Sequence, residues 1–219
     1  MSDAKVAELD DTLAEWQIYW NHWSTQSRGV AIAIRKKLLR PEGLMQLHRL
    51  VRSSDGRMIR CRMDWAGHRF CLVNVYAPNS TVEQKNFILA LHGQLADSPA
   101  PLVIGGDFNF VLDANLDRSP RPDNSRRSPD GAAADWRRHF PGLLDVWRQH
   151  RAGRHGFTWF KDGSSHCASR LDRFYVAPLM SSYFIPVRLG AAAHPALDSD
   201  HNLVVFALTA RTPVVAPPT

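Results

Sequence analysis

Four short polar segments stand beside apolar runs of the sequence, and their residue types are those that handle phosphate chemistry. Two stand at the ends of predicted strands: Asn74-Val75-Tyr76-Ala77-Pro78-Asn79 and Gly105-Gly106-Asp107-Phe108-Asn109. The other two are Ser169-Arg170-Leu171-Asp172-Arg173 and Ser199-Asp200-His201-Asn202, the latter just before the last predicted strand. Because loops on a rigid scaffold carry most catalytic side chains, we expect the four segments to share one cleft.

The acids, amides and imidazole of these segments form a set that suits phosphodiester hydrolysis. Carboxylates can hold a hard cation such as Mg²⁺, which polarises a phosphate and stabilises developing charge. One carboxylate can take a proton from water, and an Asp–His pair containing His201 can serve the phosphate. Each residue also has a structural alternative: Asp107 and Asn109 can form an Asx-turn, and Asp200 can cap the next segment. Taken together, the set favours the catalytic interpretation.

Apolar patterning predicts more strands than helices. Strands are predicted at Gly29–Arg35, Arg57–Asp64, His68–Tyr76, Leu102–Gly106, Phe157–Phe160, Arg170–Val176, Phe184–Leu189 and Leu203–Leu208. Helices are predicted at Ala4–Ile18, from the capping box Ser80-Thr81-Val82-Glu83 to Leu95, at Ala132–Phe140 and at Leu143–His150. Strands that are neighbours in sequence favour mixed or antiparallel sheets covered by helices over a regular doubly wound fold.

Length and charge narrow the class of protein. The 219 residues suffice for one sizeable core, so we expect a single domain over residues 1–210 and a Pro-rich tail over 211–219. A net charge of +6 favours a polyanionic partner such as nucleic acid. No apolar run approaches the ~20 residues of a membrane span, and the three cysteines fit no zinc pattern. We therefore expect an intracellular protein that does not contact membranes.

In their order along the chain, the polar segments resemble the endonuclease/exonuclease/phosphatase superfamily. The resemblance rests on VYAPN (Tyr76, Asn79), GDFN (Asp107, Asn109), FTWF (Thr158, Trp159), SRLDRFYV (Asp172) and SDH (Asp200, His201). It is closest to the apurinic-type endonuclease domains of non-LTR (LINE-like) retrotransposons and runs from about Trp16 to Leu208. It implies an α/β (α+β) fold, a four-layer sandwich of two packed mixed β-sheets flanked by helices.

The resemblance also implies roles for particular residues. The implied catalytic set is Tyr76, Asn79, Asp107, Asn109, Asp172 and His201. Within it, Asp107 activates the attacking water, and His201, paired with Asp172, contacts the phosphate. A Mg²⁺ (or Mn²⁺) ion is expected beside Asp107 and Asp200. Nucleic-acid contacts are expected from Arg118, Arg121, Arg126, Arg127, Thr158, Trp159 and Arg170.

The chain departs from the family pattern at its start. Family members begin with a strand carrying an Asn, then a helix, then a strand ending in Gln-Glu-Thr, whose Glu is a principal metal ligand. This strand–helix–strand is missing here, and Asp3, Glu8 and Glu15 stand in no matching motif. The sequence therefore leaves open whether the chain is an active enzyme.

The leading hypothesis is a Mg²⁺-dependent DNA endonuclease domain of a non-LTR retrotransposon. It would nick duplex DNA in the nucleus, contact the DNA through its backbone, and work beside a reverse-transcriptase domain of a longer polyprotein. Two alternatives stay open. One is a catalytically impaired nucleic-acid-binding remnant without the metal-ligand Glu. The other is a hydrolase of small phosphoesters with the same fold, against which the basic charge counts.

Overall fold

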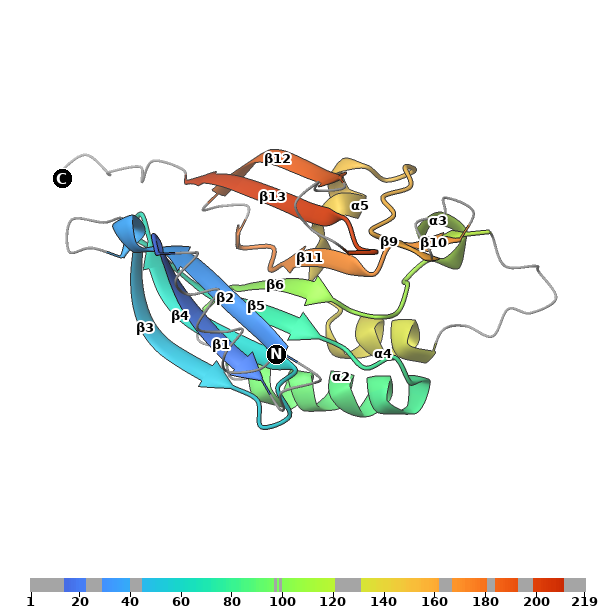
Figure 1. The fold of residues 1–219 in the computed structure, drawn as a ribbon, viewed down its shortest axis with the longest axis horizontal. Helices are drawn as coiled ribbons and strands as arrows, with labels where there is room; N and C mark the ends of the chain where they lie inside the picture. The colour runs from blue at the N-terminus through green and yellow to red at the C-terminus, as the bar shows by residue number, and fades with distance from the viewer. Residues whose placement is uncertain are drawn as a thin grey trace, which may run out of the picture.

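The structure is a computed structural model, shown in Figure 1. It describes residues 14–22, 29–39, 45–96, 98, 100–120, 131–161, 167–180, 184–192 and 199–210, with the backbone alone described at 184–192 and 207–210. The predicted tail at 211–219 and residues 4–13 of the predicted first helix lie outside these ranges.

A six-stranded mixed sheet forms the centre of the fold, with the strand order β3-β4-β5-β6-β11-β8 (Figure 1). Its strands are β3 (Met45–Arg52), β4 (Met58–Trp65), β5 (His68–Tyr76), β6 (Leu102–Asp107), β8 (Leu144–Asp145) and β11 (Asp172–Val176). Strands β5 and β6 run parallel, whereas the other neighbours are antiparallel. The carboxyl ends of β5 and β6 therefore meet the amino end of β11 at one end of the sheet.

Helices cover one face of this sheet. The helices α2 (Thr81–Leu95) and α4 (Gly131–His139) pack against each other and against the strands (Figure 1). Val73 and Val75 of β5 point to this face and pack with Ile88 and Leu91 of α2 and with Trp136 of α4, all at most 2% exposed. Burial of these apolar side chains fixes α2 as the crossover between the parallel strands β5 and β6.

Two antiparallel hairpins pack on the opposite face. The first pairs β1 (Trp16–His22) with β2 (Gly29–Arg35), and the second pairs β12 (Phe184–Ala192) with β13 (Leu203–Ala210). Val30, Ile32 and Ile34 alternate along β2 and belong to an apolar core that includes β4. The second hairpin is joined to the sheet by the rings of Phe174 and Phe206, whose centroids lie 5.6 Å apart.

An open groove of about 520 Å³ separates the two hairpins. Residues of β2 and of β13 line its sides, and residues of β5, β6 and β11 line its floor. Among the described residues, no third strand pairs with β2 or with β13. The predicted mixed α/β class with packed sheets is confirmed, and the layer facing the central sheet consists of two hairpins rather than one continuous sheet in the described part of the chain.

Short elements surround the end of the sheet where β5, β6 and β11 meet. A three-stranded sheet combines β7 (Arg118–Ser119), β10 (Ala168–Ser169) and β9 (Trp159–Phe160). The helices α3 (Ala114–Asp117) and α5 (Val146–His150) complete this region, and a 3-10 helix, η1 (Lys36–Leu38), follows β2.

Most of the longer elements fall where the sequence predicts them. Strand β3 and the short elements η1, α3, β7 and β10 are not among the predicted elements, and three predicted elements differ in the structure. Trp16 to Ile18, predicted as helix, belong to β1, because the aromatic and apolar residues of this run pair with β2. Helix α2 begins directly after Ser80 as predicted, but the Ser80 side chain makes no capping hydrogen bond, so the capping box is not formed. The predicted helix at Leu143–His150 is shorter, since Leu144 and Asp145 pair with β11.

Candidate active site

Two aspartates from distant parts of the chain face each other at the end of the central sheet. Asp107 is the last residue of β6 and Asp172 is the first of β11, and the antiparallel register places them directly opposite each other. His201, next to the start of β13, completes a group in which one ligating atom of each residue lies within 4.8 Å of the others. The structure therefore brings these three residues together, as the sequence analysis expects.

The two glycines before Asp107 are required by close packing. A Cβ atom on Gly106, whose φ is +140°, would lie 2.0 Å from the carbonyl oxygen of Val75, and one on Gly105 would lie 2.5 Å from the Phe174 ring. Because only glycine lacks the Cβ, strand β6 can approach β5 and β11 closely enough to bring Asp107 into the group.

Asp172 and His201 form a hydrogen-bonded pair. The Asp172 Oδ2 lies 2.8 Å from the His201 Nδ1, and both side chains keep some exposure, 21% and 28%. The hydrogen bond with Asp172 raises the pKa of His201, whereas partial burial acts in the opposite direction. The pair therefore favours an imidazolium that can face a phosphate.

Asp107 lies in a different electrostatic environment. Burial raises the pKa of Asp107, and the neighbouring carboxylate of Asp172 raises it further. The backbone N–H of Asn109 donates to Asp107 Oδ1 at 2.9 Å, and this bond acts in the opposite direction. A carboxylate with a raised pKa is a better proton acceptor than an ordinary one, which suits a general base.

A cleft of about 640 Å³ opens beside the acidic group. Tyr76, Asn79 and Asn109, all in the predicted catalytic set, line this cleft together with Asp107 and His201. Asn109 has a φ of +51°, and its side-chain N–H donates to the Ala77 carbonyl at 2.8 Å. This hydrogen bond therefore joins the loop after β5 to the loop after β6, and both loops line the cleft.

Asp200, predicted beside the metal, is held by an indole. Its Oδ2 accepts a hydrogen bond from Nε1 of Trp159 at 2.7 Å, and its side chain is exposed at the cleft wall. Asp200 is not one of the three residues whose ligating atoms converge. Its role at a metal ion stays a prediction.

The predicted nucleic-acid contacts separate into three groups. Arg118 and Trp159 line the cleft, as the prediction requires. Arg121, Arg126 and Arg127 lie outside the described residues. Thr158 and Arg170 are each 1% exposed, so the prediction that they contact nucleic acid does not fit their positions.

Arg170 is instead the centre of a buried ion network. Its guanidinium donates to Asp117 at 2.7 Å and to Asp145 at 2.7 Å, and Arg148 also bonds to Asp117. Burial by itself raises the pKa of Asp117, but the bonds and charges of Arg170 and Arg148 outweigh it, and the pKa is lowered. Arg170 therefore connects α3, α5 and the start of β11 behind the site.

Thr158 forms hydrogen bonds with the backbone on both sides of the Asp172–His201 pair. Its Oγ1 accepts hydrogen bonds from the backbone N–H groups of Leu171 and Asp172, at 3.0 and 2.9 Å. Its backbone carbonyl accepts the N–H of Asn202 at 2.6 Å, and Trp159 forms a bridge with His201. Sequence analysis did not predict this role, because the partners of Thr158 lie more than ten residues away.

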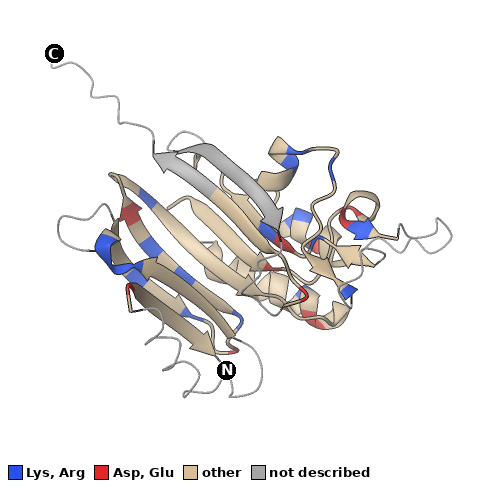
Figure 2. Cartoon of the chain, turned by 45° about the horizontal axis from the view of Figure 1, so that its top comes forward, with Lys and Arg blue, Asp and Glu red and all other residues tan. Residues whose placement is uncertain are grey.

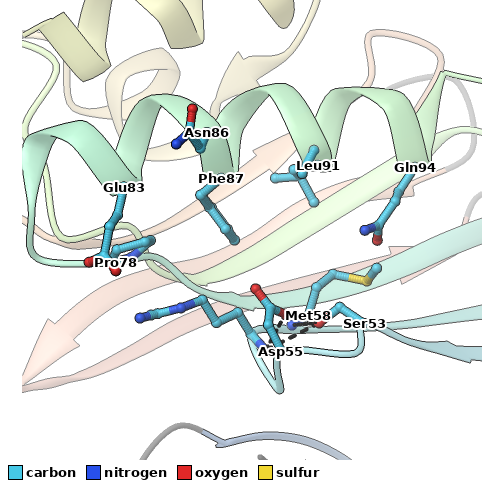
Figure 3. A pocket seen from close by; sticks show the side chains of 11 residues that line it. Ser53, Asp55, Met58, Pro78, Glu83, Asn86, Phe87, Leu91 and Gln94 are labelled. Atoms are coloured by element: carbon cyan, nitrogen blue, oxygen red, sulfur yellow. Dashed lines mark hydrogen bonds between the residues drawn. The ribbon is translucent and has the colours of Figure 1, made fainter.

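A second cavity lies away from the acidic group, between α2 and the turn that joins β3 and β4 (Figure 3). Its volume is about 340 Å³, and Glu83, Phe87, Leu91 and Gln94 of α2 project toward Ser53, Asp55 and Met58 of the turn and β4. None of its lining residues belongs to the group of three ligating side chains.

Basic residues are spread along the chain. Figure 2 shows Lys and Arg on the strands at one end of the molecule and on the short helices and loops at the other. Arg118 is the predicted phosphate contact that the structure places at the cleft itself. None of the described helices has both the length and the apolar character needed to cross a bilayer.

Comparisons with known sequences found a matching family and a similar protein. Residues 3–201 match the sequence profile of the Endonuclease/Exonuclease/phosphatase family. The "Transposon TX1 uncharacterized 149 kDa protein" of Xenopus laevis is 31% identical over 195 residues, which is 87% of this chain and 14% of that protein. The chain thus spans a small part of that relative.

Solved structures share the fold at low sequence identity. An AP endonuclease from Archaeoglobus fulgidus is similar with a TM-score of 0.70 and 18% identity, covering 94% of this chain and 85% of the other. TDP2 from D. rerio, complexed with a single strand DNA product, is similar with a TM-score of 0.66 and 15% identity, covering 95% and 83%. Both likenesses show the fold alone.

Proposed function

Since the chain belongs to the endonuclease/exonuclease/phosphatase family, we propose that it hydrolyses phosphodiester bonds of duplex DNA with a divalent cation, as the nicking endonuclease of a non-LTR retrotransposon. The observation that carries the proposal is the convergence of Asp107, Asp172 and His201 within 4.8 Å at the end of the central sheet. The similarity to a Xenopus laevis transposon protein supports the retrotransposon setting. D. rerio TDP2, which shares the fold and was solved with a single strand DNA product, supports DNA as the kind of substrate.

The donor set fits a hard cation. Two carboxylates directly opposite each other on neighbouring strands repel unless positive charge lies between them, and carboxylate oxygens are the ligands that Mg²⁺ prefers. Asp107 and Asp172 would hold the Mg²⁺ (or Mn²⁺), with Asp200 near it at the cleft wall. When bound, the ion polarises the phosphate and stabilises its developing negative charge.

Side chains of the cleft carry out the other parts of the proposed reaction. Asp107 takes a proton from the attacking water, whose oxygen bonds to phosphorus as the bond from phosphorus to the 3′ oxygen breaks. His201, kept as an imidazolium by Asp172, donates a hydrogen bond to the phosphate. Tyr76, Asn79 and Asn109 position the phosphate from the cleft wall. The 3′ oxygen takes a proton from solvent water, so the nick carries a 3′-hydroxyl and a 5′-phosphate.

The substrate class is tested by comparing two kinds of phosphoester. The purified chain is incubated with Mg²⁺ and either supercoiled plasmid or inositol phosphates. The proposal predicts open circular DNA with extendable 3′-hydroxyl ends and no release of inorganic phosphate. Release of phosphate from the small substrates with intact plasmid would favour the small-phosphoester hydrolase instead.

Backbone contacts to DNA predict a strong response to salt. Arg118 lines the cleft and is the described residue to which we assign a phosphate contact. We expect affinity for a random duplex to fall about 10³-fold or more between about 50 and about 200 mM salt. The Arg118→Ala variant should reduce the slope of log K against log salt by about 1, without changing sequence preference. A flat salt response in the wild type would remove the proposed DNA contact.

One observation favours a second candidate function. Within the described residues only three ligating side chains converge, and Asp200 is held by Trp159 rather than included among them. So small a set of ligands favours a weak cation site and hence the nucleic-acid-binding remnant. The remnant would bind duplex DNA with the salt response above but never nick it.

The proposal also covers the extent of the domain, its cellular compartment and the longer protein to which it belongs. Residues 1–210 form one domain followed by the tail at 211–219, and the domain works in the nucleus within a longer polyprotein that carries a reverse transcriptase. The small share of the frog relative that the chain spans is consistent with such a polyprotein. Detection of reverse-transcriptase activity copurifying with the native, full-length protein tests this setting.

A further inference from the structure

Gln84 occupies an unusual position for an amide side chain. It lies in the first turn of α2 but is only 2% exposed, unlike its neighbours Glu83 and Lys85, which face solvent. Its Nε2 donates to the carbonyl of Pro78 at 2.9 Å and to the carbonyl of Asn109, also at 2.9 Å. Because carbonyl oxygens can only accept, the NH₂ group of the amide must face both of them.

These two carbonyls belong to the two loops that carry cleft residues. Pro78 stands between Tyr76 and Asn79 in the loop after β5, and Asn109 stands in the loop after β6. The Asn109 side chain donates to the Ala77 carbonyl in turn, so the loops are cross-linked twice. Gln84 closes a ring of hydrogen bonds that ties α2, the first loop and the second loop together.

The ring holds a residue in a sparsely populated backbone conformation. Asn109 has a φ of +51°, in the left-handed region that non-glycine residues adopt uncommonly, Asn more readily than most. The bond from Gln84 to the Asn109 carbonyl acts directly on that residue, whose N–H donates to Asp107 Oδ1. The Gln84 Oε1 is buried and accepts no hydrogen bond within the described residues, so the two bonds donated by Nε2 are the side-chain hydrogen bonds that hold Gln84 there.

We infer that Gln84 is a positioning residue that sets the distance between Asn79, Asn109 and Asp107 in the cleft, acting through Pro78 and Asn109 without touching substrate. The role in the reaction rests on the proposed function, whereas the tether itself does not. Replacing Gln84 with Met keeps the length and shape of the side chain and removes both donors. The matched control is Gln94→Met, the same change on the same helix, because Gln94 is exposed and projects into the second cavity (Figure 3).

The tether is measured first by hydrogen exchange, which needs no activity. In Gln84→Met the amides of Ala77 and Asn109, which donate to Asp107, exchange about tenfold faster, while Gln94→Met leaves them unchanged. Unchanged exchange at both amides in Gln84→Met overturns the inference, whether or not the chain cuts DNA.

The role in the reaction is measured with plasmid nicking in Mg²⁺. Gln84→Met lowers kcat about 10- to 100-fold with unchanged DNA affinity, and this loss shrinks in an Asn109→Gly background. An equal loss in both backgrounds, or none in an active wild type, overturns the positioning role. If the wild type never nicks but its amides respond to Gln84→Met, the tether is supported and the proposed function is contradicted.

Discussion

Asp172 lies directly opposite Asp107 across the antiparallel pair of β11 and β6, with one ligating atom of each within 4.8 Å of the other. Like charges in this position destabilise a sheet, so the arrangement requires a compensating positive charge. His201 supplies part of it through its bond to Asp172. The same requirement makes the pair a natural site for a divalent cation.

The Asp172–His201 pair is predicted to act as one unit. We expect His201→Gln and Asp172→Asn each to lower the nicking rate about 10²- to 10³-fold with little change in DNA affinity, because the imidazolium acts on the developing charge. The double variant should lose little more than either single variant. Rate measurements on the four proteins of this cycle check the prediction, and strictly multiplicative losses would show that the two side chains act independently.

The Thr158 hydroxyl is predicted to stabilise the fold and the site together. Thr158→Val keeps the shape but leaves the N–H groups of Leu171 and Asp172 without their acceptor, which costs about 1–3 kcal/mol of unfolding free energy. Thr158→Ser retains the hydroxyl and should retain most of the stability. Urea unfolding compares the variants, and a Thr158→Val protein as stable as Thr158→Ser would exclude this role for the hydroxyl.

How far the sequence predicts the site depends on the kind of residue. Asp107, Asp172 and His201 could be found because each stands within a short motif beside an apolar run, Asp107 at the end of a strand and the other two at or just before the start of one. Thr158, Arg170 and Gln84 could not be assigned correctly, since their roles depend on partners from distant segments, such as Asp117, 53 residues from Arg170. A polar residue that is buried among such partners has the same local pattern as an exposed one.

The fold, like the site, contains elements that the local sequence predicts and elements that depend on distant contacts. The β4–β5 hairpin, helix α2 and strand β6 follow from local periodicity and turn residues. The start of strand β1 is predicted as helix, because Val6, Leu9 and Leu13 precede it at helical spacing that Trp16, its first residue, continues. Its pairing with β2 is a tertiary contact. The arrangement of the hairpins around an open groove depends on packing that no local pattern encodes.

The buried ion network predicts a large loss of stability when Arg170 is replaced. Arg170→Met would leave the carboxylates of Asp117 and Asp145 buried without their main partner, which costs about 3–5 kcal/mol. The control is Arg138→Met, at an exposed position of α4. Chemical unfolding measures both, and a near-neutral Arg170→Met would contradict the structural role and reopen a contact with nucleic acid.

A surface carboxylate predicts a defined pH dependence. The hydrogen bond from Arg69 lowers the pKa of Asp64 to about 2, with His48 contributing in the same direction. Because this pKa lies below the ordinary value of about 4, Asp64 stabilises the fold above pH ~4 and loses its contribution as the pH falls toward 2. Asp64→Asn should therefore lower stability at neutral pH, and the difference from wild type should vanish at the acidic end of this window. A difference that persists at pH ~2 would contradict the assignment.

The most direct test compares the nicking of supercoiled plasmid by the purified chain and by Asp107→Asn, with Mg²⁺ and with a chelator. The proposed mechanism predicts that the wild type converts plasmid to open circles only with Mg²⁺, and that Asp107→Asn is slower by about 10²-fold or more. Equal nicking by both proteins, or an intact plasmid with a wild type that retains its fold, would contradict the account.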